Sequence, residues 1–436
     1  MSLWIPFSPD MTVNIVTLGC SKNLVDSEHL LAQFRAAGYT VLHDSSEDAD
    51  LLILNTCGFI LDAKEESVDA VLQAIELKKE GRIQKLYVMG CLSERYMEDL
   101  SGEMPEVDGF YGVWDWADIL RDSGTTLDKQ LLSTRELSTP SHYAYLKISE
   151  GCNRTCAFCA IPGIRGKQQS LPLETLVEES HLLAQKGVKE LILIAQDLTT
   201  YGTDIYGRKA LPDLLKELVK IEKLQWIRLH YAYPTGFPEE VISLMASEEK
   251  ICNYLDIPIQ HVNDDVLNAM GRGHSRTQLE ALLKAFREKV PDVALRTTVL
   301  TGFPGESPEA FRELMEYVEA TRFERLGVFP YSHEEDTPAY NLKDGLSIME
   351  KQERASALMD LQQHISLELN EDKIGKTLKV LVDRKEGDLY IGRSQYDSPE
   401  VDNEVLIRSM KELSPGEFYS IRITSAGEFD LFGEPA

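Results

Sequence analysis

The order of apolar and polar positions changes twice along the chain and so divides it into three parts. In residues 11–125, short apolar runs alternate with stretches whose apolar residues recur at helical spacing. Such alternation is typical of a parallel sheet covered by helices, so we expect an N-terminal α/β domain. The expected strands are residues 13–19, 51–56 and 85–90, and the expected helices are residues 27–37 and 63–81.

A linker and a second, longer alternation follow. Residues 121–141 hold glycine, threonine and proline among polar residues, which predicts a linker. Residues 138–368 then repeat the strand–helix pattern six times. This predicts an open, partial (β/α)6 barrel whose site lies at the carboxyl ends of its strands. The expected strands are residues 144–149, 190–196, 226–231, 254–259, 294–301 and 325–331.

The last part of the chain has a different pattern. After a long helix expected at residues 347–370, residues 371–436 contain five short alternating runs separated by turn residues. This pattern predicts a small antiparallel β-barrel. The expected fold class is therefore α/β, with two parallel-sheet domains followed by a small all-β domain.

Each of the three expected strands in the first part is followed at once by a cysteine. These are Cys20, Cys57 and Cys91. Parallel strands place their carboxyl ends at one edge of the sheet, where open α/β sheets bind ligands, so we expect the three thiols to converge. The alternative is three separate buried cysteines that act as small apolar residues. Their shared position at strand ends favours a common site.

A second set of thiols has the spacing C-x3-C-x2-C, at Cys152, Cys156 and Cys159. A structural zinc site takes four protein ligands, and no fourth cysteine follows closely. Three cysteines on a four-iron cluster leave one iron open to substrate or cofactor, so the spacing predicts a reactive iron–sulfur cluster. The remaining cysteine, Cys252, has no partner at ligand spacing, and we expect an inert thiol.

Composition and charge narrow the possible partners. The net charge is −27, so the chain repels phosphate backbones and suits a basic partner, unless the acidity serves only solubility. No apolar stretch approaches the ~20 residues that span a bilayer, so no membrane association is expected. Residues 1–10 lack the pattern of a signal peptide, and seven cysteines without a disulfide pattern fit a cytoplasmic protein.

The C-x3-C-x2-C run after a barrel strand resembles the radical S-adenosylmethionine superfamily, with Phe158 where that superfamily favours an aromatic residue near the adenine. The resemblance implies that the open iron binds S-adenosylmethionine and that one electron cleaves the sulfonium to a deoxyadenosyl radical. Weaker candidates for cofactor contacts are Gln196, Asp197, Arg296 and Gly302. Asp197 could equally cap a helix, and Arg296 could pair with a structural acid. No catalytic acid or base is assigned.

Further blocks resemble the methylthiotransferases, and within them the branch that acts on a ribosomal protein. They cover essentially the whole chain from Met11, and lie at residues 18–28, 55–60, 90–92, 148–152 and 160–166. The transfer-RNA branch typically has Gln-Met-Asn after its first cysteine, where this chain has Ser-Lys-Asn. One departure is Leu171, where the family leads us to expect arginine.

The resemblance implies that Cys20, Cys57 and Cys91 hold a second [4Fe-4S] cluster, which provides the sulfur of a thiomethyl group. One S-adenosylmethionine supplies the methyl group and another the radical, and an electron donor is needed. In the ribosomal-protein branch, the radical removes hydrogen from the β-carbon of an aspartate in the twelfth small-subunit ribosomal protein.

The C-terminal part resembles the TRAM domain, which often binds RNA. Residues 371–436 nevertheless carry nine Lys and Arg against fourteen Asp and Glu. This balance suits a basic ribosomal protein better than a nucleic acid. Two rival hypotheses are methylthiolation of an adenosine in transfer RNA and a non-catalytic iron–sulfur protein that binds RNA or assists assembly. The acidic charge counts against both, and the open-site triad counts against the second.

Overall fold

The structure is a computed structural model that describes residues 11–436, so the expectation about a signal peptide lies outside the described residues. Two compact units make up this part of the chain. The first contains the described residues up to Ser138 together with residues 150–153 and 160–168. The second contains residues 139–149, 154–159 and 169–436. No helix in residues 11–436 is long and apolar enough to cross a membrane.

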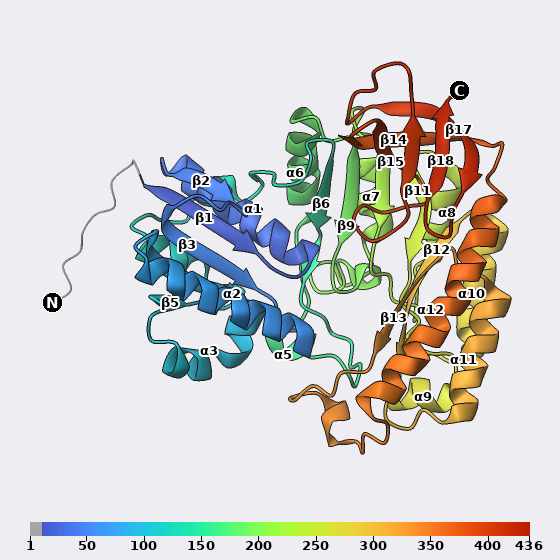
Figure 1. Ribbon diagram of the computed structural model, residues 1–436, viewed down its shortest axis with the longest axis horizontal. Coiled ribbons are helices and arrows are strands. Elements are labelled where there is room, and N and C mark those ends of the chain that lie inside the picture. Colours follow the sequence, from blue (N-terminus) through green and yellow to red (C-terminus); the bar gives the residue numbers. More distant parts are fainter. Residues whose placement is uncertain (1–10) are drawn as a thin grey trace. The chain divides into compact units, whose positions relative to one another are not determined.

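The first unit is built on a five-stranded parallel sheet in the order β2-β1-β3-β4-β5 (Figure 1). All three strands expected from the sequence are present, and the short β2 and β5 are added at the two edges. The strands are β1 (Thr12–Thr17), β2 (Thr40–His43), β3 (Ala49–Thr56), β4 (Ile83–Gly90) and β5 (Gly109–Phe110). The helices are α1 (Ser21–Ala36), α2 (Leu61–Lys79), α3 (Cys91–Glu103), α4 (Trp116–Asp122) and α5 (Ile161–Ile164), with a 3-10 turn η1 (Lys129–Leu131).

Both faces of this sheet are covered because its strands are apolar at consecutive positions. In β3, Leu51 and Ile53 pack with α1 and α4, whereas Leu52 and Leu54 pack with α2. Successive side chains of a strand point to opposite faces, so a continuous apolar run requires cover on both. The run at residues 51–56 therefore predicted a central strand correctly.

The segment expected to be a linker packs against α1 instead of lying in solvent. Arg135 forms an ion pair with Glu28, and both side chains are fully buried. The same carboxylate accepts a hydrogen bond of 2.7 Å from the Ser138 hydroxyl. The backbone N–H of Asp128 donates to Gln33 over 2.9 Å. Polar residues suggested a linker, but their partners lie about a hundred residues earlier and leave no local signal.

The second unit contains a six-stranded, wholly parallel sheet in the order β13-β12-β11-β10-β9-β6. This confirms the open arrangement of six strands. They are β6 (Tyr143–Lys147), β9 (Glu190–Ile194), β10 (Trp226–Leu229), β11 (Ile251–Asp256), β12 (Ala294–Thr301) and β13 (Arg325–Pro330). A two-stranded ribbon, β7 (Ser149–Glu150) with β8 (Gln169–Ser170), flanks the cysteine triad in the sequence.

Helices follow the strands of this sheet, and the long helix expected at residues 347–370 is present with Ser347 as its N-cap. At the start of the long helix, Ser347 and Glu350 form a capping box, in which each side chain accepts from the other's backbone N–H. Ser307 caps the helix that begins with Pro308. The helices are α6 (Leu173–Gln185), α7 (Leu211–Leu218), α8 (Glu239–Ser247), α9 (Asp264–Ala269), α10 (Arg276–Lys289), α11 (Pro308–Thr321) and α12 (Ile348–Glu371), with 3-10 turns η2 (Leu198–Thr200) and η3 (Pro338–Asn341).

The C-terminal barrel closes in the order β14-β15-β16-β18-β17. Its strands are β14 (Thr377–Glu386), β15 (Leu389–Ser394), β16 (Val405–Arg408), β17 (Phe418–Ala426) and β18 (Leu431–Pro435). The small barrel is confirmed, with one difference, because β16 and β18 pair in parallel while the other pairs are antiparallel. A closed ring of five strands cannot alternate direction throughout, so at least one parallel pair is unavoidable.

The C-terminal barrel covers the amino-terminal ends of the central strands. Trp226, the first residue of β10, packs on Phe418 with ring centroids 4.7 Å apart. Cys252 and Ala294, near the starts of β11 and β12, pack with Leu381 of β14. The thiol expected to be inert is thus fully buried in this junction, and burial raises the pKa of Cys252 to about 12.

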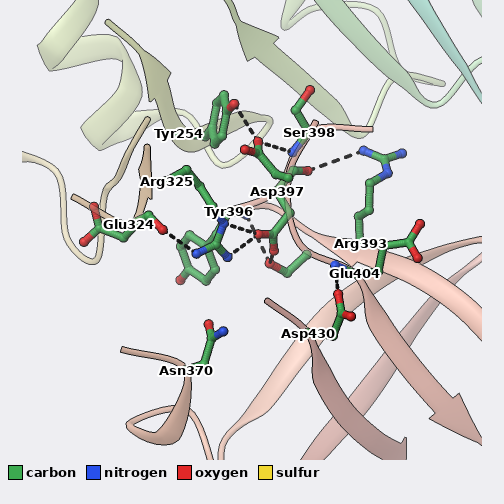
Figure 2. A network of polar contacts seen from close by, with 12 residues as sticks. Tyr254, Glu324, Arg325, Asn370, Arg393, Tyr396, Asp397, Ser398, Glu404 and Asp430 are labelled. Atoms are coloured by element: carbon green, nitrogen blue, oxygen red, sulfur yellow. Dashed lines mark hydrogen bonds and ion pairs between the residues drawn. The ribbon is translucent and has the colours of Figure 1, made fainter. Parts of the chain in front are cut away.

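A buried polar network also joins the barrel to the central strands (Figure 2). Asp397 lies between Arg325 at the start of β13 and Arg393 of β15, and it pairs with the Arg325 guanidinium. The Tyr254 hydroxyl donates to Asp402 over 2.7 Å. Buried charges are stable only when paired, so this network fixes residues 394–403 against the sheet.

Candidate metal centres

The first set of cysteines follows neighbouring strands of the first unit, because β3 lies between β1 and β4. Cys20 is the N-cap of α1, Cys57 follows β3, and Cys91 is the first residue of α3. The loops that carry them touch. A Cβ built on Gly19 would lie 2.7 Å from the Cβ of Cys57, and one built on Gly58 would lie 2.9 Å from the carbonyl carbon of Cys91.

An asparagine holds these loops together. The Asn23 side chain donates to the carbonyl oxygens of Leu18 (2.9 Å) and Thr56 (3.1 Å), which end two adjacent strands. The backbone carbonyl of Asn23 accepts from the Asn55 side-chain amide over 2.9 Å. Gly90 ends β4 and directly precedes Cys91; its φ of 99° favours glycine, and a Cβ there would meet the Asn55 side chain at 2.5 Å.

A buried arginine completes the site. The Arg165 side chain is 2% exposed, and its Nε donates to the Cys91 sulfur over 3.4 Å. The same guanidinium pairs with Glu150 (2.7 Å) and Asp26 (3.3 Å), and it also donates to the Asn23 side chain. Burial alone would lower the pKa of Arg165, but the two carboxylates dominate and raise it well above the ordinary value. In the sequence, Arg165 lies within the block at residues 160–166 that resembles the family, with no sign of these partners.

Burial favours the protonated form of two of these thiols, Cys57 and Cys91. Burial raises the pKa of Cys91 to about 11 despite the opposing effect of Arg165, and burial also raises the pKa of Cys57. Metal binding must therefore displace protons, as is usual for thiolate ligands. In residues 11–436, no three His, Cys, Asp or Glu side chains are close enough to share one metal ion. A four-iron cluster is wider than a single ion, and three cysteines with an N–H donor to sulfur fit its chemistry.

Cys152 of the second set belongs to the same unit. Its backbone N–H donates to the Gly166 carbonyl over 3.1 Å. The preceding Gly151 has a φ of 74°, and a Cβ there would lie 2.4 Å from the Lys167 carbonyl oxygen. Residues 150–153 therefore pack closely against residues 166–167, and only glycine fits at position 151.

Cys156 and Cys159 belong to the second unit. The Cys159 N–H donates to the Cys156 carbonyl over 3.1 Å, which forms a tight turn. The Ala157 N–H donates to the Met270 carbonyl over 2.8 Å, just beyond the end of α9. The Cys156 sulfur accepts an N–H from Arg272 over 3.3 Å and lies 3.6 Å from the Tyr233 hydroxyl. Two sequence-distant residues thus surround this thiol at the carboxyl side of the sheet.

Stacked cations border Cys156. The Arg154 and Arg272 guanidinium groups lie over the ring of Tyr233, at 4.0 and 4.1 Å from its centroid. Arg154 also pairs with Asp197 over 2.8 Å. The same carboxylate accepts from the Thr199 N–H, so the capping role considered for Asp197 is the one observed.

Family profiles match all three parts of the chain. They are "Uncharacterized protein family UPF0004" over residues 12–112, "Radical SAM superfamily" over residues 146–318 and "TRAM domain" over residues 374–435. Proteins from Christiangramia forsetii and Cytophaga hutchinsonii, both named "Ribosomal protein uS12 methylthiotransferase RimO", are 52% and 53% identical. The matches cover 97% of this chain and 94% and 97% of those proteins. The chain belongs to the RimO methylthiotransferase family.

Solved structures share the fold of this RimO family member at low identity. The radical S-adenosylmethionine methyltransferase TsrM from Kitasatospora setae has a TM-score of 0.55 and 14% identity, and the match covers 93% of this chain and 84% of TsrM. The cobalamin-dependent radical enzyme OxsB has a TM-score of 0.51 and 13% identity, with 81% and 56% covered. These likenesses concern the fold alone.

Three further residues of this RimO family member were suggested by the sequence as cofactor contacts: Phe158, Gly302 and Gln196. Phe158 is half-buried and packs edge-on to Phe303 with centroids 6.4 Å apart. Gly302 donates its N–H to Glu306 over 3.0 Å, and a Cβ there would lie 2.3 Å from Lys351 Cγ. Gln196 lies two residues beyond β9.

Arg296 of β12 pairs with two carboxylates of the second unit. The distances are 3.0 Å to Asp256 and 3.2 Å to Asp402. A structural role, the alternative that the sequence left open, therefore accounts for its charge. Leu171, where the family pattern led us to expect arginine, is exposed.

Proposed function

We propose that this chain attaches a methylthio group to the β-carbon of an aspartate in ribosomal protein uS12. The observation that carries the proposal is the presence of two separate sets of three cysteines, each next to the carboxyl ends of strands in a parallel sheet. Identity of about half over nearly the whole chain to relatives of that name supports the choice of substrate.

In this proposal, Cys152, Cys156 and Cys159 hold a [4Fe-4S] cluster with one open iron for S-adenosylmethionine, and Cys20, Cys57 and Cys91 hold a second cluster. The chemistry that these groups supply, when bound, is reductive cleavage of S-adenosylmethionine and provision of sulfur. A separate electron donor is required. The chain itself places Arg272 on the sulfur of Cys156 and Arg165 on that of Cys91, and hydrogen bonds to ligand sulfurs influence cluster potential.

The acidic character of the chain supports a basic protein as partner rather than transfer RNA. In the C-terminal barrel, Asp383, Asp397 and Asp402 pair with buried or half-buried arginines, so they do not add to its surface charge. The exposed carboxylates of Asp388 and Glu412 remain available to a basic surface, whereas those of Glu386, Glu417 and Glu434 are paired with basic side chains. A ribosomal substrate would also place this enzyme in the cytoplasm.

Anaerobic reconstitution with iron and sulfide, followed by mass spectrometry, tests the proposal. We expect roughly eight irons per chain and a mass increase on uS12, with transfer RNA unchanged. Iron near four per chain would contradict the second cluster. Thiomethylated transfer RNA together with unmodified uS12 would overturn the substrate assignment.

A further inference from the structure

Arg165 connects elements that are far apart in the sequence. It lies just beyond α5, and its guanidinium contacts Asp26 on α1, Cys91 at the start of α3, and Glu150 at the end of β7. All of these residues belong to the first unit. A guanidinium presents five N–H donors in a rigid planar fork, so it can hold several partners in fixed directions at once.

The number of carboxylates around Arg165 exceeds what charge balance requires. A buried guanidinium needs one paired carboxylate to offset the loss of hydration, and a second brings the local charge below zero. Asp26 and Glu150 come from separate elements, so the pair of ionic contacts joins those elements. The side chains are only 4% and 8% exposed, which makes each contact sensitive to loss of its partner.

Glu150 places this connection next to the second set of cysteines, because it lies two residues before Cys152. The Arg165 side chain holds the Glu150 carboxylate, and the neighbouring Gly166 carbonyl accepts from the Cys152 N–H over 3.1 Å. The rigid, tightly packed Gly151 stands between them. The peptide that carries Cys152 is thus fixed on both sides by residues 165 and 166.

We propose that Arg165 is a positioning residue that holds Cys91 of one cysteine set and the Cys152 peptide of the other in a fixed arrangement. This inference rests on the proposed function, in which the two sets hold two clusters that act on one substrate carbon. Misplacement by about 1 Å can cost up to 10²-fold in rate. Loss of the connection should therefore uncouple cleavage of S-adenosylmethionine from methylthiolation while leaving cleavage itself largely intact.

The test uses the reconstituted full chain with Arg165→Lys and Glu150→Gln. Lysine keeps the charge but cannot hold three partners in one plane, and glutamine removes the charge on the Cys152 side while leaving the contact between Arg165 and Cys91. Lys167→Met is the control, since it removes an exposed cation two residues from Arg165. The measurements are iron content, the ratio of 5′-deoxyadenosine to methylthiolated uS12, and the spin–spin interaction between the reduced clusters by electron paramagnetic resonance.

We expect full iron content, a ratio raised about tenfold or more, and a changed spin–spin interaction in both variants, with Lys167→Met like the wild type. An unchanged ratio and an unchanged interaction would overturn the proposal. So would iron near four in both variants, because the two residues would then serve assembly of a cluster. If the wild type fails to modify uS12, the proposed function fails, but the spectroscopic comparison still decides the role of Arg165.

Discussion

Two buried arginines each direct an N–H at a cysteine sulfur, one in each unit of the chain. Arg165 lies 3.4 Å from the Cys91 sulfur, and Arg272 lies 3.3 Å from that of Cys156. Their surroundings differ. Arg165 is paired with two carboxylates, whereas Arg272 forms no ion pair with any carboxylate in residues 11–436 and instead donates to the Pro258 carbonyl over 2.5 Å.

The two arginines make the same kind of hydrogen bond to a cysteine sulfur, but the bond has a different consequence in each unit. Arg272 brings an uncompensated positive charge to one thiol, which would favour the reduced form of the cluster proposed there. Arg165 brings a charge that Asp26 and Glu150 already offset, so its main effect is to connect elements. Both arginines contact cysteines that the proposed function assigns as cluster ligands, and such outer partners commonly orient metal ligands.

The largest expected effect concerns the thiols themselves. Cys152→Ala should abolish cleavage of S-adenosylmethionine, because the proposed open-iron cluster would lose a ligand. Cys57→Ala should leave cleavage in place and stop sulfur insertion. The measurement is 5′-deoxyadenosine and methylthiolated uS12 from the same reaction. Cys252→Ala, at a fully buried thiol outside both sets, is the control and should retain both activities. Cleavage lost in Cys57→Ala but kept in Cys152→Ala would invert the two roles.

Arg272→Met should have a smaller effect, which is a lower midpoint potential of the cluster proposed at the triad. A charged hydrogen bond contributes roughly 1.5 kcal/mol, which corresponds to about 60 mV, or tenfold in the equilibrium constant, for a one-electron couple. We expect the midpoint potential of the triad cluster to fall by that amount and cleavage to slow under limiting reductant. The measurement is a potentiometric titration followed by electron paramagnetic resonance.

The product ratio distinguishes Arg272 from Arg165. In Arg272→Met, 5′-deoxyadenosine and methylthiolated product should fall together, because the connection between the two cysteine sets is untouched. Arg272→Lys should restore part of the potential, since it keeps the charge. A raised ratio in Arg272→Met would show that both arginines position ligands, and the distinction between them would then be lost.

The sequence predicted the features of these sites that depend on local pattern. Apolar runs located the strands, and the strand ends placed Cys20, Cys57 and Cys91 side by side. It could not reveal that Arg165 meets Asp26, a residue 139 positions earlier, because such pairing leaves no periodic signal. The same reason explains the parallel pairing of β16 with β18, the packing of residues 126–138 on α1, and the structural partners of Arg296.

The smallest effect concerns pH and follows from His274, which packs near Tyr233 in the second unit. Burial, and then the charge of Arg272, lower the pKa of His274 to about 4. In the unfolded chain an imidazole titrates near about 6.5, so between these values the unfolded state binds more protons and stability falls as the pH drops. Above about pH 6.5 the imidazole is neutral in both states, so His274 does not make the unfolding free energy depend on pH. None of the contacts of Arg165 is a histidine, so this pH dependence belongs to the Arg272 site alone.

His274→Gln should remove that part of the pH dependence. Relative to the wild type, the variant should gain up to roughly 3 kcal/mol in unfolding free energy as the pH falls from about 7 toward 4. Urea unfolding at a series of pH values measures the difference between the two proteins, which cancels the other titrating groups. His364→Gln, at an exposed histidine, should follow the wild type throughout. If the curves for His274→Gln and the wild type stay parallel, the imidazole is not held neutral by its surroundings.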